Sequence, residues 1–129
     1  MGIELQTEAD PALPFVNIDA FAIRRMLNNL IWNALEACIK DKKEDSNIVV
    51  VRIGFYDKSH IHLEIEDNGI GMDETTKANI FEEFYSTKGS SGTGLGLAVV
   101  EKIVNKHGGI IEVETEPGQG TLFRIILKT

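Results

Sequence analysis

Three groups of polar residues and glycines in this sequence have types and spacings suited to chemistry. The first lies in "DNGIGM", where Asp67 ends an alternating apolar run and Gly69 and Gly71 follow it. A carboxylate at this place accepts a charge-assisted hydrogen bond from an exocyclic amine, which favours adenine over guanine, and the glycines leave room for a flat ligand. The alternative is an ordinary turn, in which Asp67 and Asn68 cap their own backbone and the glycines supply positive φ angles.

The second group is the glycine cluster of "GTGLGL", which comprises Gly92, Gly94 and Gly96 and directly precedes a predicted helix. Bare backbone N–H groups and the positive end of the helix dipole converge there, so phosphate is the expected ligand. The alternative is a plain loop before a capped helix. The spacing fits neither GxxxxGK[ST] nor GxGxxG, so a phosphate site here would be of another type.

The third group is Asn29 and Asn33, which lie one turn apart on a predicted helix. The amide oxygen of Asn33 suits Mg²⁺, a hard cation that prefers oxygen ligands and keeps several waters while it bridges substrate phosphates. Asparagine is mildly unfavourable inside helices, so two on one face suggest a function. Simple solvent exposure is the alternative.

The elements that must position these groups follow from hydrophobic periodicity and from turn residues. Helices are expected from an N-cap at Asp19 to about Lys40, within 72–84 with Asp73 as the N-cap, and over 95–107. Extended segments are expected at 15–19, 47–56, 60–67, 110–116 and 120–127. This order predicts an α+β fold, a two-layer sandwich in which three helices pack on one face of a mixed, mostly antiparallel sheet of about five strands.

Composition limits the classes of function. The 129 residues are the length of one domain, so we expect a single domain over 1–129. A net charge of -7 disfavours nucleic acid as a partner. One cysteine, Cys38, excludes a disulfide framework and favours the cytoplasm. No apolar run approaches a membrane span, so no membrane contact by this domain is expected, although a parent protein could be membrane-attached.

Four motifs, "NNLIWNALEA", "DNGIGM", "FEEFYSTK" and "GTGLGL", follow one another in this chain. From about Asp19 to Leu127 it resembles the catalytic and ATP-binding domain of bacterial sensor histidine kinases. These belong to the Bergerat-fold (GHKL) superfamily, with gyrase, the heat-shock chaperones and the mismatch-repair ATPases. The resemblance implies a protein histidine kinase of two-component signal transduction, with ATP and Mg²⁺ as cofactors. It would donate the γ-phosphoryl group to a histidine on the dimerisation domain of the same parent protein, and would serve a response regulator receiver domain indirectly.

The resemblance also implies roles for single residues. At the adenine end it implies a carboxylate for the amino group, two glycines that shape the pocket, and a threonine that acts through water: Asp67, Gly69, Gly71 and Thr121. At the phosphate end it implies Asn33 as the metal ligand and two residues with catalytic roles, Asn29 as a second polar contact and Lys88 near the terminal phosphate. The triphosphate would lie along Gly92, Thr93, Gly94, Leu95 and Gly96. Phe81 and Phe84 would anchor a mobile lid.

One departure from the wider superfamily concerns the general base. Hydrolysing members carry a glutamate one turn before the magnesium asparagine, whereas this chain has Asn29 there, and an amide cannot take a proton from water. A self-contained ATPase or an anti-sigma-type serine kinase is therefore less favoured, and a non-catalytic nucleotide-sensing module is a further alternative. His60, His62 and His107 lack the sequence context of a phosphoacceptor, so we expect the acceptor histidine on another segment.

Overall fold

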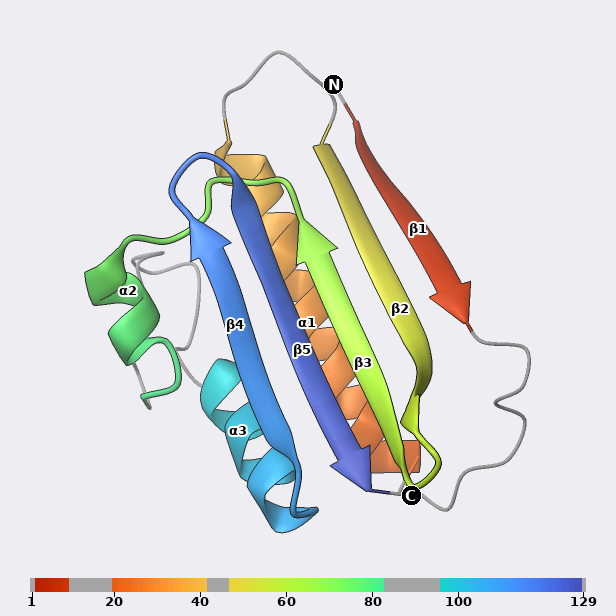
Figure 1. Ribbon diagram of the computed structural model, residues 1–129. Coiled ribbons are helices and arrows are strands. Elements are labelled where there is room, and N and C mark those ends of the chain that lie inside the picture. The colour runs from red at the N-terminus through yellow and green to blue at the C-terminus, as the bar shows by residue number, and fades with distance from the viewer. Residues whose placement is uncertain (1, 10–19, 42–46, 83–95, 129) are drawn as a thin grey trace.

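The computed structural model describes residues 2–9, 20–41, 47–82 and 96–128, and Figure 1 shows them as a sheet with the two longer helices behind it and a short helix beside its edge. The sheet has the strand order β1-β2-β3-β5-β4, in which β1 pairs parallel to β2 and the other pairs are antiparallel. The strands are β1 (Ile3–Ala9), β2 (Asn47–Asp57), β3 (His60–Asp67), β4 (Ile110–Glu116) and β5 (Gly120–Lys128). The helices are α1 (Ala20–Lys40), α2 (Glu74–Asn79) and α3 (Gly96–Lys106). The predicted α+β sandwich with a mixed five-stranded sheet is confirmed.

The first strand differs from the sequence prediction. The first extended segment was expected at 15–19. These residues, which include the expected helix cap Asp19, lie outside the described residues. One edge strand of the sheet is β1, which the sequence did not predict and whose residues beyond Ile3 are all exposed. An edge strand with little buried surface has only a weak apolar alternation, which explains why the sequence did not reveal it.

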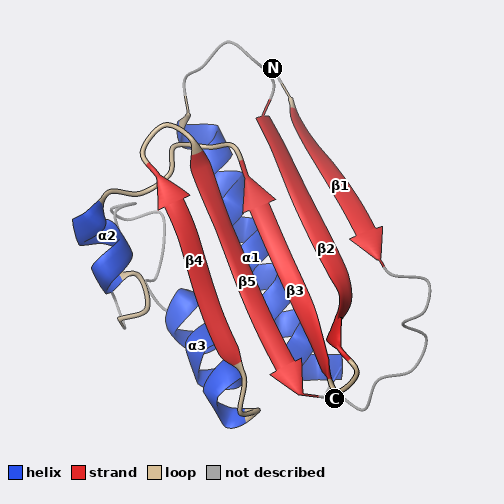
Figure 2. Ribbon diagram, viewed as in Figure 1, coloured by secondary structure: helices blue, strands red, loops and turns tan. Residues whose placement is uncertain are grey.

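Helix α1 covers the middle of the sheet (Figure 2). It buries Met26, Leu30, Ala34 and Cys38, four residues at i, i+4 spacing that face the sheet. Cys38 is therefore part of the core. Full burial of a side chain of the size of Leu30 stabilises the fold by about 1.5–3 kcal/mol.

Strand β3 alternates strictly between the two faces of the sheet. Ile61, Leu63 and Ile65 point into the core under the helices, while the residues between them are half-buried on the opposite face. Because this alternation has a period of two, Asp67 falls in the same inward phase as the three apolar residues. The register of the strand thus buries a carboxylate at its end.

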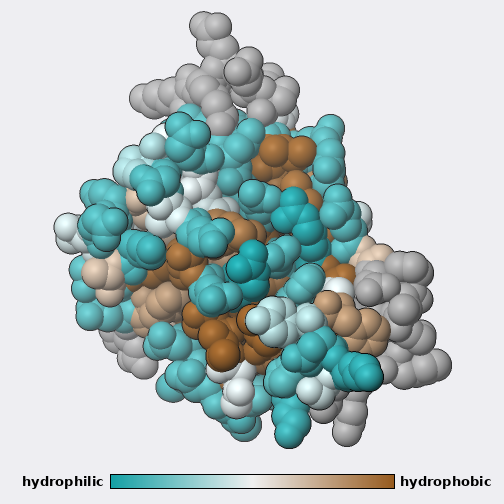
Figure 3. All heavy atoms as spheres, in the orientation of Figure 1, coloured by the Kyte–Doolittle hydropathy of each residue, from teal (hydrophilic) through white to brown (hydrophobic). Residues whose placement is uncertain are grey.

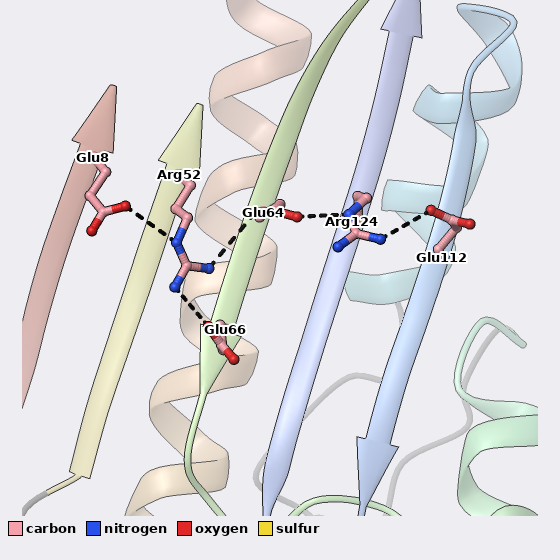
Figure 4. A network of polar contacts seen from close by, with 6 residues as sticks. All are labelled: Glu8, Arg52, Glu64, Glu66, Glu112 and Arg124. Carbon is pink, nitrogen blue, oxygen red and sulfur yellow. Dashed lines mark hydrogen bonds and ion pairs between the residues drawn. The ribbon is translucent and has the colours of Figure 1, made fainter. Parts of the chain in front are cut away.

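The face of the sheet that lacks helices carries a ladder of alternating charges across all five strands (Figure 4). Figure 3 shows hydrophilic side chains spread over this face, with hydrophobic patches between them. The ladder contains four carboxylates and two guanidinium groups: Glu8, Arg52, Glu64, Glu66, Arg124 and Glu112. The hydrogen bond to Glu66 raises the pKa of Arg52, and the hydrogen bond to Glu64 raises that of Arg124. These ion pairs link neighbouring strands on the face of the sheet opposite to the core.

The predicted cap of α2 and the glycine end of α3 are confirmed, although α2 ends at Asn79, before the end near residue 84 that the sequence predicted. Asp73 caps α2, since its carboxylate accepts a hydrogen bond of 2.8 Å from the backbone N–H of Thr76. Helix α3 is followed by Gly108, which has a φ of +64°, and the N–H of Gly109 donates back to the carbonyl of Val104 at 2.9 Å. Within the described ranges, no helix has both the length and the apolar character needed to cross a bilayer.

Candidate functional site

The end of β3 presents a buried carboxylate beside a buried hydroxyl. Asp67 pairs with Thr121 of β5 in the antiparallel register, and both residues are 5% exposed. Side chains that are directly opposite in such a pair lie about 5 Å apart at Cβ. The predicted adenine-end residues Asp67 and Thr121 are therefore neighbours in one buried place.

The turn that follows Asp67 uses both polar side chains to hold the backbone. The carboxylate of Asp67 accepts a hydrogen bond of 2.8 Å from the N–H of Gly69, and the amide oxygen of Asn68 accepts one of 2.8 Å from the N–H of Ile48. The capping alternative is thus confirmed for Asp67, whereas Asn68 bonds the backbone of β2 rather than that of its own turn. The cap does not exclude ligand binding, because a carboxylate accepts up to about four hydrogen bonds.

The glycines of "DNGIGM" allow close packing of this turn against two other elements. A Cβ atom on Gly69 would lie 2.6 Å from the carbonyl carbon of Ala37 in α1. Gly71 has a φ of +67°, and a Cβ there would collide with the carbonyl oxygen of Glu116. The space beside both glycines is filled by protein backbone, so their contribution to a base pocket stays a prediction. They would contribute by allowing the turn to take this path.

Thr115, which the sequence analysis did not single out, connects this turn to β5. Its hydroxyl oxygen accepts from the N–H of Met72 at 3.0 Å, donates to the carbonyl of Gly120 at 3.0 Å, and lies 2.9 Å from the hydroxyl oxygen of Thr121. Gly120 was also missed, although a Cβ at this position, with a φ of +118°, would collide with the carbonyl oxygen of Asp67. Thr115 and Thr121 directly flank "EPGQG" on its two sides. A hairpin turn there pairs them, and this spacing could have identified Thr115 from the sequence.

Helix α1 connects the turn after Asp67 with the start of α3. The amide nitrogen of Asn29 donates to the carbonyl of Gly96 at 3.3 Å, while eight residues further on the carbonyl of Ala37 accepts from Ile70 at 3.3 Å. Asn33 lies midway between them on the same face of the helix. The rise from Asn29 to Ala37 is about 12 Å. One helix face therefore links the glycine turn, the two asparagines and the start of α3.

Only part of the predicted phosphate end falls within the described residues. Gly96 is the first residue of α3, and no atom lies within 4 Å of the place where its Cβ would be. Phe81 makes an edge-to-face contact with the core residue Phe123, with ring centroids 6.4 Å apart. The other predicted residues lie outside the described residues: Phe84, Lys88, Gly92, Thr93, Gly94 and Leu95.

The donor groups in this region fit a metal held mainly by its substrate. No cluster of three or more His, Cys, Asp or Glu able to hold a metal ion occurs in the part of the chain that the structure describes. Asn33 is half-buried and carries a neutral amide oxygen. Mg²⁺ that bridges phosphates needs only one or two protein ligands and keeps its remaining waters, so this donor set fits Mg²⁺ bound together with a nucleotide.

Comparison with known proteins gives relatives of one kind. The family model described as "Histidine kinase-, DNA gyrase B-, and HSP90-like ATPase" matches residues 18–129. The signal transduction histidine-protein kinase AtoS of Escherichia coli (strain K12) is 36% identical over 125 residues, which are 97% of this chain and 20% of AtoS. The sensory histidine kinase/phosphatase NtrB of Azospirillum brasilense is 35% identical over 127 residues, 92% of this chain and 31% of NtrB. The chain thus spans between a fifth and a third of these two relatives.

Solved structures agree in fold across almost the whole chain. The mycobacterial sensor histidine kinase MprB matches with a TM-score of 0.79 at 30% identity, over 98% of this chain and 81% of that one. The catalytic domain of histidine kinase ThkA matches with a TM-score of 0.79 at 28% identity, over 98% and 80%. This chain therefore belongs to the family of histidine kinase-, DNA gyrase B- and HSP90-like ATPases, as its four sequence motifs predicted.

Proposed function

We propose that residues 1–129 form a single catalytic domain that binds Mg²⁺ and ATP and supplies the γ-phosphoryl group to a histidine on the dimerisation domain of the same parent protein. The observation that carries this proposal is the arrangement along α1. The buried carboxylate of Asp67 lies beyond one end of a helix face, and the start of α3 lies against the other, next to Asn29. A nucleotide has the matching polarity, with an amine at one end and phosphates at the other.

The adenine end would be held by Asp67 and Thr121. A buried carboxylate that meets an exocyclic amine forms a charge-assisted hydrogen bond worth about 1.5–3 kcal/mol. Gly69 and Gly71 contribute by letting the turn pack tightly on α1 and on β4, which fixes the position of the carboxylate.

The phosphate end would be held by the start of α3 and by the asparagines of α1. The backbone N–H groups of Gly96 and of the preceding residues 92–95 would bind the phosphates at the positive end of the helix dipole. Asn33 would ligate Mg²⁺, and Asn29 and Lys88 would contact the phosphates. Bound Mg²⁺ would neutralise charge on the phosphate oxygens during transfer. In the reaction, a histidine nitrogen of the partner domain forms the new N–P bond as the bond between the γ-phosphorus and the β–γ bridging oxygen breaks, and ADP leaves.

The three histidines of this chain do not suit the role of acceptor. His60 is hydrogen-bonded to Asp57, at the end of β3 opposite to Asp67, about 23 Å away along the strand. The Nδ1–H of His107 donates to the carbonyl of Ile103 at 2.8 Å, and His107 lies just past the end of α3 that is remote from Gly96. His62 lies on the sheet face that carries the charge ladder. The proposal therefore places the acceptor histidine on another domain.

The relatives support this choice over a self-contained ATPase, an anti-sigma-type serine kinase and a nucleotide sensor. AtoS and NtrB are named as histidine kinases, and the full-length structure of ShkA, which matches with a TM-score of 0.81, is titled as a complex with AMPPNP. The amide nitrogen of Asn29 donates to the carbonyl of Gly96. An amide cannot act as the general base that a self-contained ATPase needs at this position. A receiver domain as an indirect partner and a place in the cytoplasm belong to the same proposal.

The test combines nucleotide binding with phosphoryl transfer. The chain is mixed with γ-labelled ATP, Mg²⁺ and the purified dimerisation domain of its parent, and we expect acid-labile label on that domain with near-background hydrolysis by the chain alone. Asp67→Asn should weaken ATP binding about tenfold or more, the equivalent of one charge-assisted bond. Asp57→Asn makes the same chemical change on the exposed hairpin and should leave affinity unchanged. Rapid hydrolysis without transfer would favour the ATPase, and binding without either would favour the sensor.

A further inference from the structure

We propose that Thr115 is a positioning residue, which holds the hydroxyl of Thr121 as a hydrogen-bond acceptor toward the base and thereby favours an amino group over a carbonyl at position 6 of the purine. This inference rests on the proposed function, because it concerns how the same site chooses its nucleotide. It adds a residue of β4 to a site otherwise built from β3, β5 and α1.

Thr115 has a single hydroxyl hydrogen, and three polar groups lie within hydrogen-bond distance of its oxygen. A threonine hydroxyl has one hydrogen to donate and two lone pairs to accept with. The carbonyl oxygen of Gly120, 3.0 Å away, can only accept, so it takes the single hydrogen of Thr115. The N–H of Met72, 3.0 Å away, can only donate, so it uses one lone pair. One lone pair remains on the Thr115 oxygen.

The remaining lone pair decides the orientation of Thr121. Its hydroxyl oxygen lies 2.9 Å from that of Thr115, and either atom could be the donor on distance alone. Because the hydrogen of Thr115 is already committed to Gly120, the three contacts form together only if Thr121 donates to Thr115. The oxygen of Thr121 then has only lone pairs to offer to a ligand.

The surroundings make this orientation matter. Thr121 pairs directly with Asp67, and both residues are almost fully buried, so a ligand there meets two acceptor side chains whose Cβ atoms lie about 5 Å apart. An exocyclic amine has two hydrogens and can satisfy both acceptors, directly or through one water that donates to Thr121. A carbonyl oxygen at the same place would face two acceptors without a hydrogen between them, which is unfavourable in a buried site.

The experiment compares ATP with inosine triphosphate, which has a carbonyl in place of the 6-amino group. Thr115→Val removes the acceptor for the hydrogen of Thr121 and leaves that hydroxyl free to turn toward the ligand. We expect the preference for ATP over inosine triphosphate, measured as the ratio of the two dissociation constants, to fall about tenfold. Thr115→Ser keeps the hydroxyl and should restore the ratio of the unmodified chain. Thr7→Val, on the exposed edge strand β1, makes the same change outside the site and should have no effect.

The outcomes separate this inference from the proposed function. If Thr115→Val weakens both nucleotides by one factor, or neither, the inference is wrong while ATP binding stands. If the unmodified chain binds neither nucleotide, the proposed function is wrong. NMR of the nucleotide-free, unmodified chain tests the inference even where the valine variant does not fold. The hydroxyl proton of Thr121 should exchange slowly with water and show a nuclear Overhauser effect to Thr115, and its rapid exchange would overturn the inference.

Discussion

Replacement of Gly69 by alanine adds one methyl group where the turn after β3 packs on helix α1. The new Cβ would lie 2.6 Å from the carbonyl carbon of Ala37, 2.7 Å from its oxygen and 2.9 Å from the nitrogen of Cys38. Unstrained contacts of carbon atoms are about 3.5–4.0 Å, so the turn and the helix must separate by about 1 Å. All three atoms are backbone atoms of a 21-residue helix, which cannot yield locally as a flexible side chain does.

The separation has a cost that can be bounded. Overpacking of this kind costs about 1–3 kcal/mol. The hydrogen bond of 3.3 Å from Ile70 to Ala37 would also lengthen, which loses about 1 kcal/mol. The lower entropy of the unfolded alanine chain returns about 0.4–1 kcal/mol. We therefore expect Gly69→Ala to lower the free energy of unfolding by about 2 kcal/mol, which for a chain of this length lowers Tm by about 7 °C.

Thermal unfolding followed by circular dichroism measures this change. Gly96→Ala is the matched control, because a Cβ there meets no atom within 4 Å and alanine is at least as favourable in a helix. It should leave Tm unchanged or slightly higher. A Gly69→Ala protein as stable as the unmodified chain would refute the close approach of β3 and α1 on which the position of Asp67 depends.

Two further perturbations test the supports of the site. Asn68→Ala removes the acceptor for the N–H of Ile48 and should lower the free energy of unfolding in denaturant by about 1–3 kcal/mol, whereas Asn28→Ala at an exposed position should change it little; equal effects would contradict this account. The hydrogen bond from the backbone N–H of Thr76 lowers the pKa of Asp73, so the cap stabilises α2 above the ordinary aspartate pKa and is lost as the pH falls through the lower pKa of the folded state. The amide resonance of Thr76 in an acid titration should follow this loss, and a resonance that does not move would count against the cap.

The elements that position the site were predictable where their burial is periodic. Helix α1 and strand β3 have one face in the core, and this gives their sequences clear periods of 3.6 and 2 residues. The inward direction of Asp67 follows from the same alternation, although it became clear only from the burial pattern of β3. Edge strand β1 buries little and so leaves little pattern.

The contacts within the site were less predictable because they are tertiary. The glycines of "DNGIGM" indicate that another group approaches the backbone closely at this turn. No local signal identifies that group as Ala37 of α1, which fills the space at Gly69. The role of Thr115 depends on the register of the β4–β5 hairpin, which brings it opposite Thr121. That register can be worked out from the turn, but the third partner, the N–H of Met72, comes from a distant segment.

The most direct test of the central claim is a titration of the ¹⁵N-labelled chain with ATP in the presence of Mg²⁺. The claim is that one nucleotide occupies both ends of the α1 face. It predicts that the amide resonances of Gly69 and Gly96, on two elements far apart in the sequence, shift together with one dissociation constant. Saturating nucleotide that leaves both resonances unmoved, or that shifts only residues of the charge ladder on the opposite face of the sheet, would contradict it.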